Sequence, residues 1–123
     1  MFKVHCSYGE IVDKLTILEL KKLHTNDPQQ RQHIDREYKL LEPYKKHDND
    51  VLFSELYNEL YIINKNLWDC ENKIRQKSKS KTYDKHYISI SEDIHVQNDK
   101  RYDVKRKINE QYQSYIYEEK IYK

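Results

Sequence analysis

Apolar side chains surround most of the helix that the sequence predicts from residue 8 to residue 23. At about 100° per residue, Ile11, Leu15 and Leu18 share one face, while Leu20 lies on the opposite side. A helix that is apolar nearly all round is typically a central, buried one. We therefore expect this first helix at the centre of the fold.

Two carboxylates interrupt this apolar surface. Asp13 falls beside Leu20 around the helix, and Glu19 falls beside Val12. An unpaired charge is costly to bury, so each carboxylate needs a cation from a side chain, a metal or a ligand. We expect both to be at least partly buried and at least one of them to form an ion pair. The candidate cations are Arg75, Arg101 and Lys105.

Sequence signals mark where the first two helices begin. Ser7 and Glu10 match a capping box, in which the serine hydroxyl accepts from a first-turn amide and the glutamate reaches back. Asp27 is suited to cap a second helix with Pro28 at its first position, where the missing N–H costs nothing. Pro43 disturbs the end of that helix. Its apolar stripe consists of Ile34, Tyr38 and Leu41.

The clearest helical pattern runs from residue 52 to residue 74, where apolar side chains recur at steps of three and four. These side chains are Leu52, Leu56, Leu60, Ile63, Leu67, Cys70 and Ile74. One margin of the stripe carries Asn64, Trp68, Glu71 and Arg75. We interpret the basic stretch 77–81 as a solvated linker, because like charges with serine favour neither packing nor helix.

The last segment begins near Thr82 and keeps helical phase as far as Ile94. Under one interpretation, Asp99 caps a new helix after a break. Under the other, one long helix continues and carries Arg101 and Lys105 on its inward stripe. The second alternative would supply cations for the carboxylates of the first helix.

The pattern predicts an all-α fold of about four helices in an antiparallel, bundle-like arrangement, because short polar turns join long amphipathic segments. A chain of 123 residues is expected to form one helical domain, residues 1–123. One glycine, two prolines and no alanine disfavour strands joined by tight turns. The abundance of Lys, Asn, Ile and Tyr is typical of an A/T-rich genome.

Charged residues make up 36% of the chain, yet the formal net charge is only +2. This balance argues against a dedicated nucleic-acid binder, despite basic clusters at 77–85 and 100–107.

No stretch approaches the ~20 apolar residues of a membrane span, and the first residues lack the apolar run of a signal peptide. Cys6 and Cys70 form no CxxC pair, so we expect free thiols in a reducing cytoplasm.

The common enzyme signatures are missing from the sequence. One glycine rules out a Walker loop and a GxGxxG fingerprint. HExxH and paired CxxC motifs are also lacking, so we expect no cofactor and no His/Cys metal site. Glu10 and Asp13 share a helix face, as Mg²⁺-binding carboxylates do. The enzymatic alternative is therefore a Mg²⁺-dependent nucleotide pyrophosphohydrolase, although the ExxE and ExxD pairing of such enzymes is not reproduced. A competing interpretation pairs Glu10 with Lys14 one turn on.

The preferred hypothesis is a binding or assembly module of otherwise unknown function. Arg75, Arg101 and Lys105 are suited to hold a carboxylate or phosphate. If their helices pack against the first helix, they converge beside Lys14 and form a polar groove for an anionic, phosphorylated or sugar-like ligand, with Trp68 as an aromatic wall. The predicted ligand-binding set is Glu10, Asp13, Lys14, Asn64, Trp68, Glu71, Arg75, Asn98, Arg101 and Lys105. The rival hypothesis is an ion-pair network satisfied internally. An exposed flank of tyrosines is a candidate contact for a homodimer.

Three blocks that contain these polar positions span most of the chain. The first runs from Gly9 to Glu19, the second from Asn64 to Arg75, and the third from Asn98 to Asn109, followed by the residues 118–120. On these blocks the chain resembles an uncharacterised family of small helical proteins, a domain of unknown function found in bacteria and some viruses. The resemblance implies no activity, ligand or catalytic residue. The stretches 77–81 and 112–117 lie outside its pattern.

Overall fold

The computed structural model describes residues 1–47 and 49–122, which contain four α-helices, one 3₁₀ turn and no strand. The helices are α1 (Tyr8–His24), α2 (Pro28–Leu41), α3 (Val51–Lys79) and α4 (Lys85–Gln111), and the 3₁₀ turn η1 covers Glu42–Tyr44. The prediction of an all-α fold is confirmed. None of the described helices has the length and apolar character to cross a membrane.

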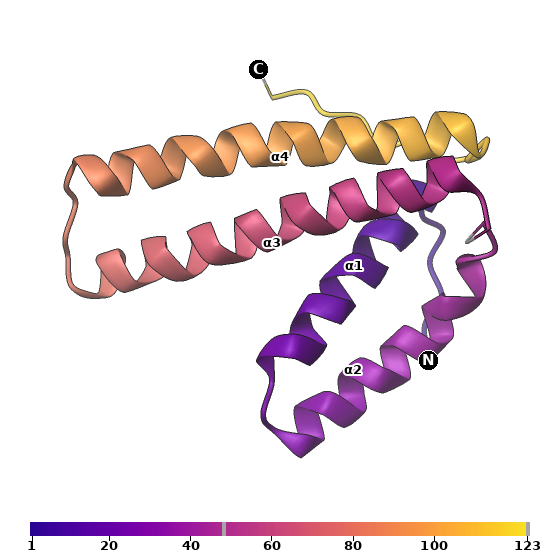
Figure 1. Ribbon diagram of the computed structural model, residues 1–123, viewed down its shortest axis with the longest axis horizontal. Helices are drawn as coiled ribbons and strands as arrows, with labels where there is room; N and C mark the ends of the chain where they lie inside the picture. Colours follow the sequence, from indigo (N-terminus) through magenta and orange to yellow (C-terminus); the bar gives the residue numbers. More distant parts are fainter. Residues whose placement is uncertain (48, 123) are drawn as a thin grey trace.

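The helices form two hairpins of unequal length (Figure 1). α3 and α4 make a long hairpin, and the shorter hairpin of α1 and α2 packs against one end of it. α1 contacts each of the other three helices, so it occupies the central position that its sequence predicts. The end of the long hairpin where α3 turns into α4 extends beyond α1 and α2 (Figure 1).

The hydrophobic core lies where α1, α3 and α4 meet. Its buried side chains are Val12, Leu15, Phe53, Leu56, Tyr57, Leu60, Ile63, Val104 and Ile108. α2 has no fully buried residue and instead packs the partly buried Tyr38 and Leu41 against this core. The apolar stripe that the sequence predicts for α3 is buried only in part, because Leu52 is 38% exposed.

A polar side chain caps the beginning of each helix. The Ser7 hydroxyl accepts from the Glu10 amide at 3.2 Å. The aspartates Asp27, Asp50 and Asp84 accept from the amides of Gln29, Leu52 and Tyr87 at 2.9, 3.0 and 2.9 Å. The starts of α1 and α2 thus follow the predicted signals, and Pro28 occupies the first turn of α2.

α4 is one continuous helix, so the alternative in which Asp99 caps a new helix is wrong. The solvated linker predicted at 77–81 is also wrong in its first part, since α3 continues to Lys79. Lysines are tolerated there because cations near a helix C-terminus interact favourably with the helix dipole. In addition, Lys77 Nζ lies 3.1 Å from Asp84 Oδ2.

The turn between α3 and α4 uses a lysine where a glycine is common. Lys81 has φ 54°, in the left-handed region. Its amide donates to the Ser78 carbonyl, and the Thr82 amide donates to the Lys77 carbonyl at 2.8 Å. These two bonds satisfy the last carbonyls of α3 and reverse the chain direction into α4.

Candidate functional site

Asp13 is the centre of a buried polar contact among α1, α3 and α4. Its side chain is fully buried, and its Oδ1 accepts from Asn64 Nδ2 at 2.8 Å and from Arg101 Nε at 3.0 Å. Arg101 also donates from Nη2 to Asp13 Oδ2, so the guanidinium binds the carboxylate through two hydrogen bonds. Asn64 donates to Thr16 Oγ1 at 2.9 Å as well. The prediction that Asp13 is buried against one of three named cations is confirmed.

This contact stabilises the charge of Arg101. The hydrogen bond to Asp13 raises the pKa of Arg101 and outweighs burial, which acts in the opposite direction. The negative charges of Asp13, Glu10 and Glu118 add to the increase. The Arg101 side chain is still 30% exposed, so it connects the interior with the surface.

A second group of charges surrounds Lys105. Its Nζ lies 2.6 Å from Glu10 Oε2 and 3.3 Å from Glu118 Oε1, so one cation bridges α1 and the C-terminal segment. The Ser7 hydroxyl, which caps α1, also donates to Glu118 Oε1 at 3.1 Å. We call the residues around these two cations the acid–base cluster: Ser7, Glu10, Asp13, Asn64, Arg101, Lys105 and Glu118.

Ion pairing determines the charge state of the second group. Burial by itself would lower the pKa of Lys105, but the hydrogen bond to Glu10 and the nearby carboxylates raise it above its usual value. Burial would likewise raise the pKa of Glu118, but the charge of Lys105 holds it below its usual value. Both groups are therefore stabilised in their charged forms.

Glu19 is half-buried, as predicted, but its partners are not the cations that the sequence suggested. Its Oε1 accepts from the Tyr57 hydroxyl at 2.8 Å and lies 3.9 Å from Lys45 Nζ. Lys45 follows η1, and its position beside α1 depends on how α2 folds back. No periodic pattern in the sequence identifies it.

The other predicted ligand-binding residues are not part of the cluster. Lys14 is exposed on α1. Glu71 and Arg75 form an exposed pair at 3.2 Å along α3. Asn98 lines a cleft of about 890 Å³ between α4 and the C-terminal segment. Trp68 lies against His24 at the end of α1. The structure thus brings together the carboxylates and cations of α1 and α4, and it leaves the distal margin of α3 outside.

A cleft forms where Trp68 meets the end of α1 and the first half of α2. The ring centroids of Trp68 and His24 are 4.6 Å apart, with their planes inclined by 30°. His24 Nδ1 donates to the Leu20 carbonyl at 2.8 Å, which fixes the orientation of the imidazole. The cleft has a volume of about 430 Å³, and we call it the Trp68 cleft. Its remaining lining residues are Lys21, Thr25, Gln30, His33, Ile34 and Glu37.

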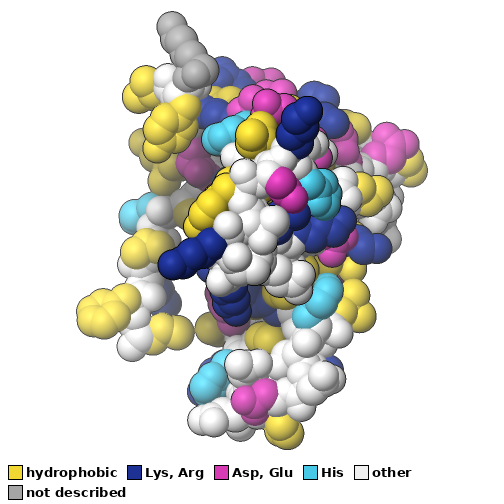
Figure 2. Space-filling model, turned by 90° about the vertical axis from the view of Figure 1, so that its left-hand side faces the viewer, with side chains coloured by type: hydrophobic (Ala, Val, Ile, Leu, Met, Phe, Trp, Pro, Cys, Tyr) yellow, Lys and Arg dark blue, Asp and Glu magenta, His cyan; other side chains and the backbone are white. Residues whose placement is uncertain are grey.

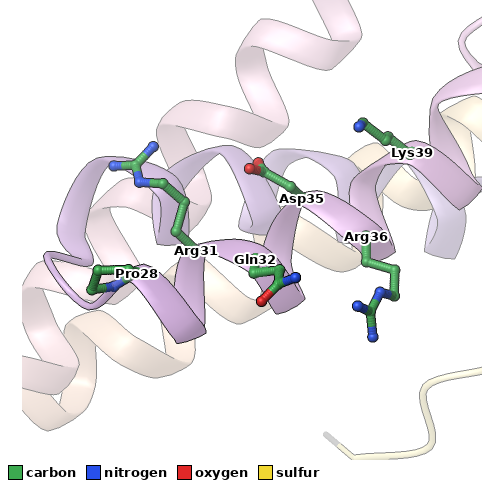
Figure 3. A pocket seen from close by; sticks show the side chains of 6 residues that line it. All are labelled: Pro28, Arg31, Gln32, Asp35, Arg36 and Lys39. Atoms are coloured by element: carbon green, nitrogen blue, oxygen red, sulfur yellow. The ribbon is translucent and has the colours of Figure 1, made fainter.

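Another concave surface lies on α2 alone and has a different character. Figure 3 shows its six lining residues, with Arg31, Asp35 and Lys39 pointing to one side of the helix and Gln32 and Arg36 to the other. These side chains diverge, and Asp35 already pairs with Lys22 at 3.1 Å. Polar groups therefore do not converge on a ligand here.

A family model described as "Family of unknown function (DUF6165)" matches residues 2–123. The chain belongs to the DUF6165 family. Comparison with curated proteins gave no match, and neither did comparison with solved structures. The resemblance to a family of unknown function is therefore confirmed, and membership of DUF6165 assigns no activity, ligand or catalytic residue.

Sequence reasoning missed the C-terminal segment of this DUF6165 protein as a source of site residues. The segment folds back along α4, where Glu118 meets Lys105 and Lys120 pairs with Asp99. Glu119 lies 3.6 Å from Arg106. Glu118 and Glu119 lie opposite the bases Lys105 and Arg106, and Lys120 lies opposite the acid Asp99, so the charges of the segment complement those of α4. That signal is present in the sequence, but it has meaning only once the segment is known to return.

Proposed function

We propose that this protein is a non-catalytic binding module, and that the Trp68 cleft receives a small anionic molecule with a sugar or base ring. The pairing of Trp68 with His24 carries the proposal. An aromatic face held at the wall of a cleft is a stacking surface for a ring. Three elements meet there, so a ligand would contact α1, α2 and α3 together.

The other lining groups support an anionic ligand. Lys21 supplies an ammonium group, and His33 supplies an imidazole, which is a hydrogen-bond donor for a phosphate. Thr25 donates to Gln30 Oε1 at 2.7 Å, which leaves the Gln30 amide nitrogen as a donor. At about 430 Å³ the cleft is within the usual size range of ligand pockets, roughly 300–1,000 Å³.

At the acid–base cluster itself, the contacts support the rival hypothesis of an ion-pair network that is satisfied within the chain. Asp13 is paired with Arg101, and Glu10 with Lys105 at 2.6 Å. The donors that could bind an anion are already engaged with carboxylates of this chain. We therefore assign the cluster a structural role and place the ligand at the Trp68 cleft.

The enzymatic alternative has less support. A Mg²⁺ site needs carboxylate oxygens that are available to the metal, whereas Glu10 and Asp13 each accept from a cation. Within residues 1–47 and 49–122, no three His, Cys, Asp or Glu side chains are grouped to hold a metal.

Trp68 is the only tryptophan, so its fluorescence reports directly on the proposed cleft. The protein is titrated with nucleoside monophosphates and with hexose phosphates, and the Trp68 emission is recorded. We expect saturable quenching, with the affinity reduced about tenfold or more in Lys21→Ala and His33→Ala, because each removes one charge-assisted contact. Arg36→Ala removes a cation of α2 that does not line the Trp68 cleft, so it is the matched control and should bind normally.

Two outcomes would reject the cleft as the site. One is the lack of a saturable change with every member of the panel. The other is equal loss of affinity in Arg36→Ala and Lys21→Ala, which would indicate non-specific attraction. The enzymatic alternative is tested separately, by incubation with Mg²⁺ and nucleoside triphosphates. Pyrophosphate release that disappears in Asp13→Asn would establish it.

A further inference from the structure

We propose that two copies of this chain associate side by side and antiparallel through the free end of the α3–α4 hairpin. We call this end the arm and define it as residues 69–99. The proposal does not depend on a ligand in the Trp68 cleft. It rests on how the arm is covered and on how its charges are distributed.

The arm lacks the third helix that covers the rest of the hairpin. Where α1 packs, Leu60 on α3 and Ile108 on α4 are fully buried. Along the arm, which the structure describes in full, Ile90 is the only residue of this seam that is buried, whereas Cys70, Ile74 and Ile94 are only partly covered. Figure 1 shows that α1 and α2 diverge from the long hairpin before it ends. An apolar seam of this kind is stabilised when another helical surface covers it.

The charges of the arm are separated along its length. Its distal part, residues 73–87, contains six Lys or Arg and one acid, Asp84, for a net charge of +5. Its proximal part, residues 69–72 and 88–99, contains five acids and no Lys or Arg, for a net charge of −5. Figure 2 looks at the molecule from the side where the distal part lies, with Lys and Arg side chains among other surface groups.

Most of these charges form no ion pair with another residue that the structure describes. In the described part of the chain, Lys73, Lys79 and Lys85 form no ion pair, and neither do the proximal acids Asp69, Glu92 and Asp93. The pairs that do form use Arg75 with Glu71, Lys77 with Asp84, and Lys120 with Asp99.

A second copy of the chain would both cover the apolar seam of the arm and pair its separated charges. In an antiparallel pair related by a twofold axis, the basic distal part of each arm lies beside the acidic proximal part of the other. The basic part includes residues 73–79 of α3, and the acidic part includes residues 88–99 of α4, so opposite charges meet where the basic stretch of one copy lies beside the acidic stretch of the other. Such an interface uses the same surface of both copies and therefore closes as a dimer. Electrostatic complementarity of this kind selects the partner and its orientation.

The test exchanges the charges of the two parts. The distal variant is Lys73→Glu, Lys79→Glu and Lys85→Glu, and the proximal variant is Asp69→Lys, Glu92→Lys and Asp93→Lys. Each variant alone places like charges opposite each other, so we expect dimer dissociation constants at least about tenfold higher than in the unaltered chain. An equimolar mixture restores opposite charges at both ends and should form heterodimers. Sedimentation equilibrium measures all three samples, and circular dichroism checks that each variant is folded.

A chain with all six substitutions provides a second measurement if one variant folds poorly, because its reversed pattern is again self-complementary. Its net charges are about −1 in the distal part and +1 in the proximal part, so it should dimerise more tightly than either triple variant but less tightly than the unaltered chain. Raising the ionic strength from ~0.02 M to ~1 M should weaken dimers of either chain, since salt screens exposed charges. The unaltered chain remaining monomeric up to about 100 µM at low salt would overturn the proposal. So would a monomer that binds a DNA or RNA duplex through the distal lysines, which would make the arm a nucleic-acid contact.

Discussion

The Gly9 amide donates a hydrogen bond to Asn109 Oδ1 at 2.6 Å, so the first turn of α1 lies directly against α4. A Cβ on Gly9 would be 2.5 Å from the Lys105 carbonyl oxygen. The single glycine of the chain thus serves a close helix contact, while among the described residues the left-handed backbone conformation is adopted by Lys81 and Gln113. This contact is what brings the carboxylates of α1 to the cations of α4.

Replacing Gly9 with Ala should destabilise the fold. In an isolated helix the change would be favourable by about 1 kcal/mol, but the methyl group would force α1 away from the Lys105 carbonyl. We expect a net loss of about 1–2 kcal/mol in the free energy of unfolding, measured with urea. Lys14→Ala, at an exposed position of the same helix, is the control. A more stable Gly9→Ala protein would show that the contact is not tight.

Asp13→Ala should lower stability far more than Glu110→Ala. The first change leaves Arg101 without its buried partner, which typically costs ~3–5 kcal/mol. The lower end of that range applies, because the Arg101 side chain is 30% exposed. Glu110 pairs with Arg106 at 3.1 Å on the surface, where such pairs contribute little. Denaturant unfolding of the two variants makes the comparison, and equal small effects would place Asp13 outside the stabilising network.

Glu118 should make a pH-dependent contribution to stability. Its pKa in the folded state lies below the ordinary value of 4.5, chiefly because the charge of Lys105 outweighs burial. A lowered pKa stabilises the folded state above the unfolded value, and that contribution is lost as the pH falls through the folded pKa. The difference in unfolding free energy between the unaltered chain and Glu118→Gln should therefore be constant at neutral pH and shrink below about pH 4.5. The same difference at pH 3 and pH 7 would contradict this.

Asp50 should contribute more to the stability of the fold than Asp27, although both residues cap helices. Asp50 Oδ1 accepts from the Leu52 amide, and its Oδ2 accepts from the Tyr112 hydroxyl at 2.7 Å, which ties the start of α3 to the end of α4. This bond lowers the pKa of Asp50, and burial together with Asp50 raises the pKa of Tyr112. Asp50→Ala should lower the midpoint of thermal unfolding more than Asp27→Ala does. Tyr112→Phe, which keeps the cap, should account for the difference between the two.

Local physical chemistry made much of this fold predictable from the sequence. The period of apolar positions and the caps at Ser7 and Asp27 depend on interactions within a few residues, so helix starts could be predicted. The angular position of Asp13 on an apolar helix predicted its burial for the same reason. The phase of the last segment put Arg101 on the inward face in one of the two alternatives that the sequence left open.

Tertiary structure decided which charges meet and where a cleft forms. Glu118 reaches Lys105 only because a segment without helical periodicity returns along α4. Trp68 on α3 meets His24 at the end of α1 because these two helices pack against each other. Arg75 lies on the margin of the apolar stripe of α3, but it remains on the surface because α3 extends beyond α1. Periodicity determines which way a side chain points from its helix axis, but the relative positions of the axes result from packing of the whole core.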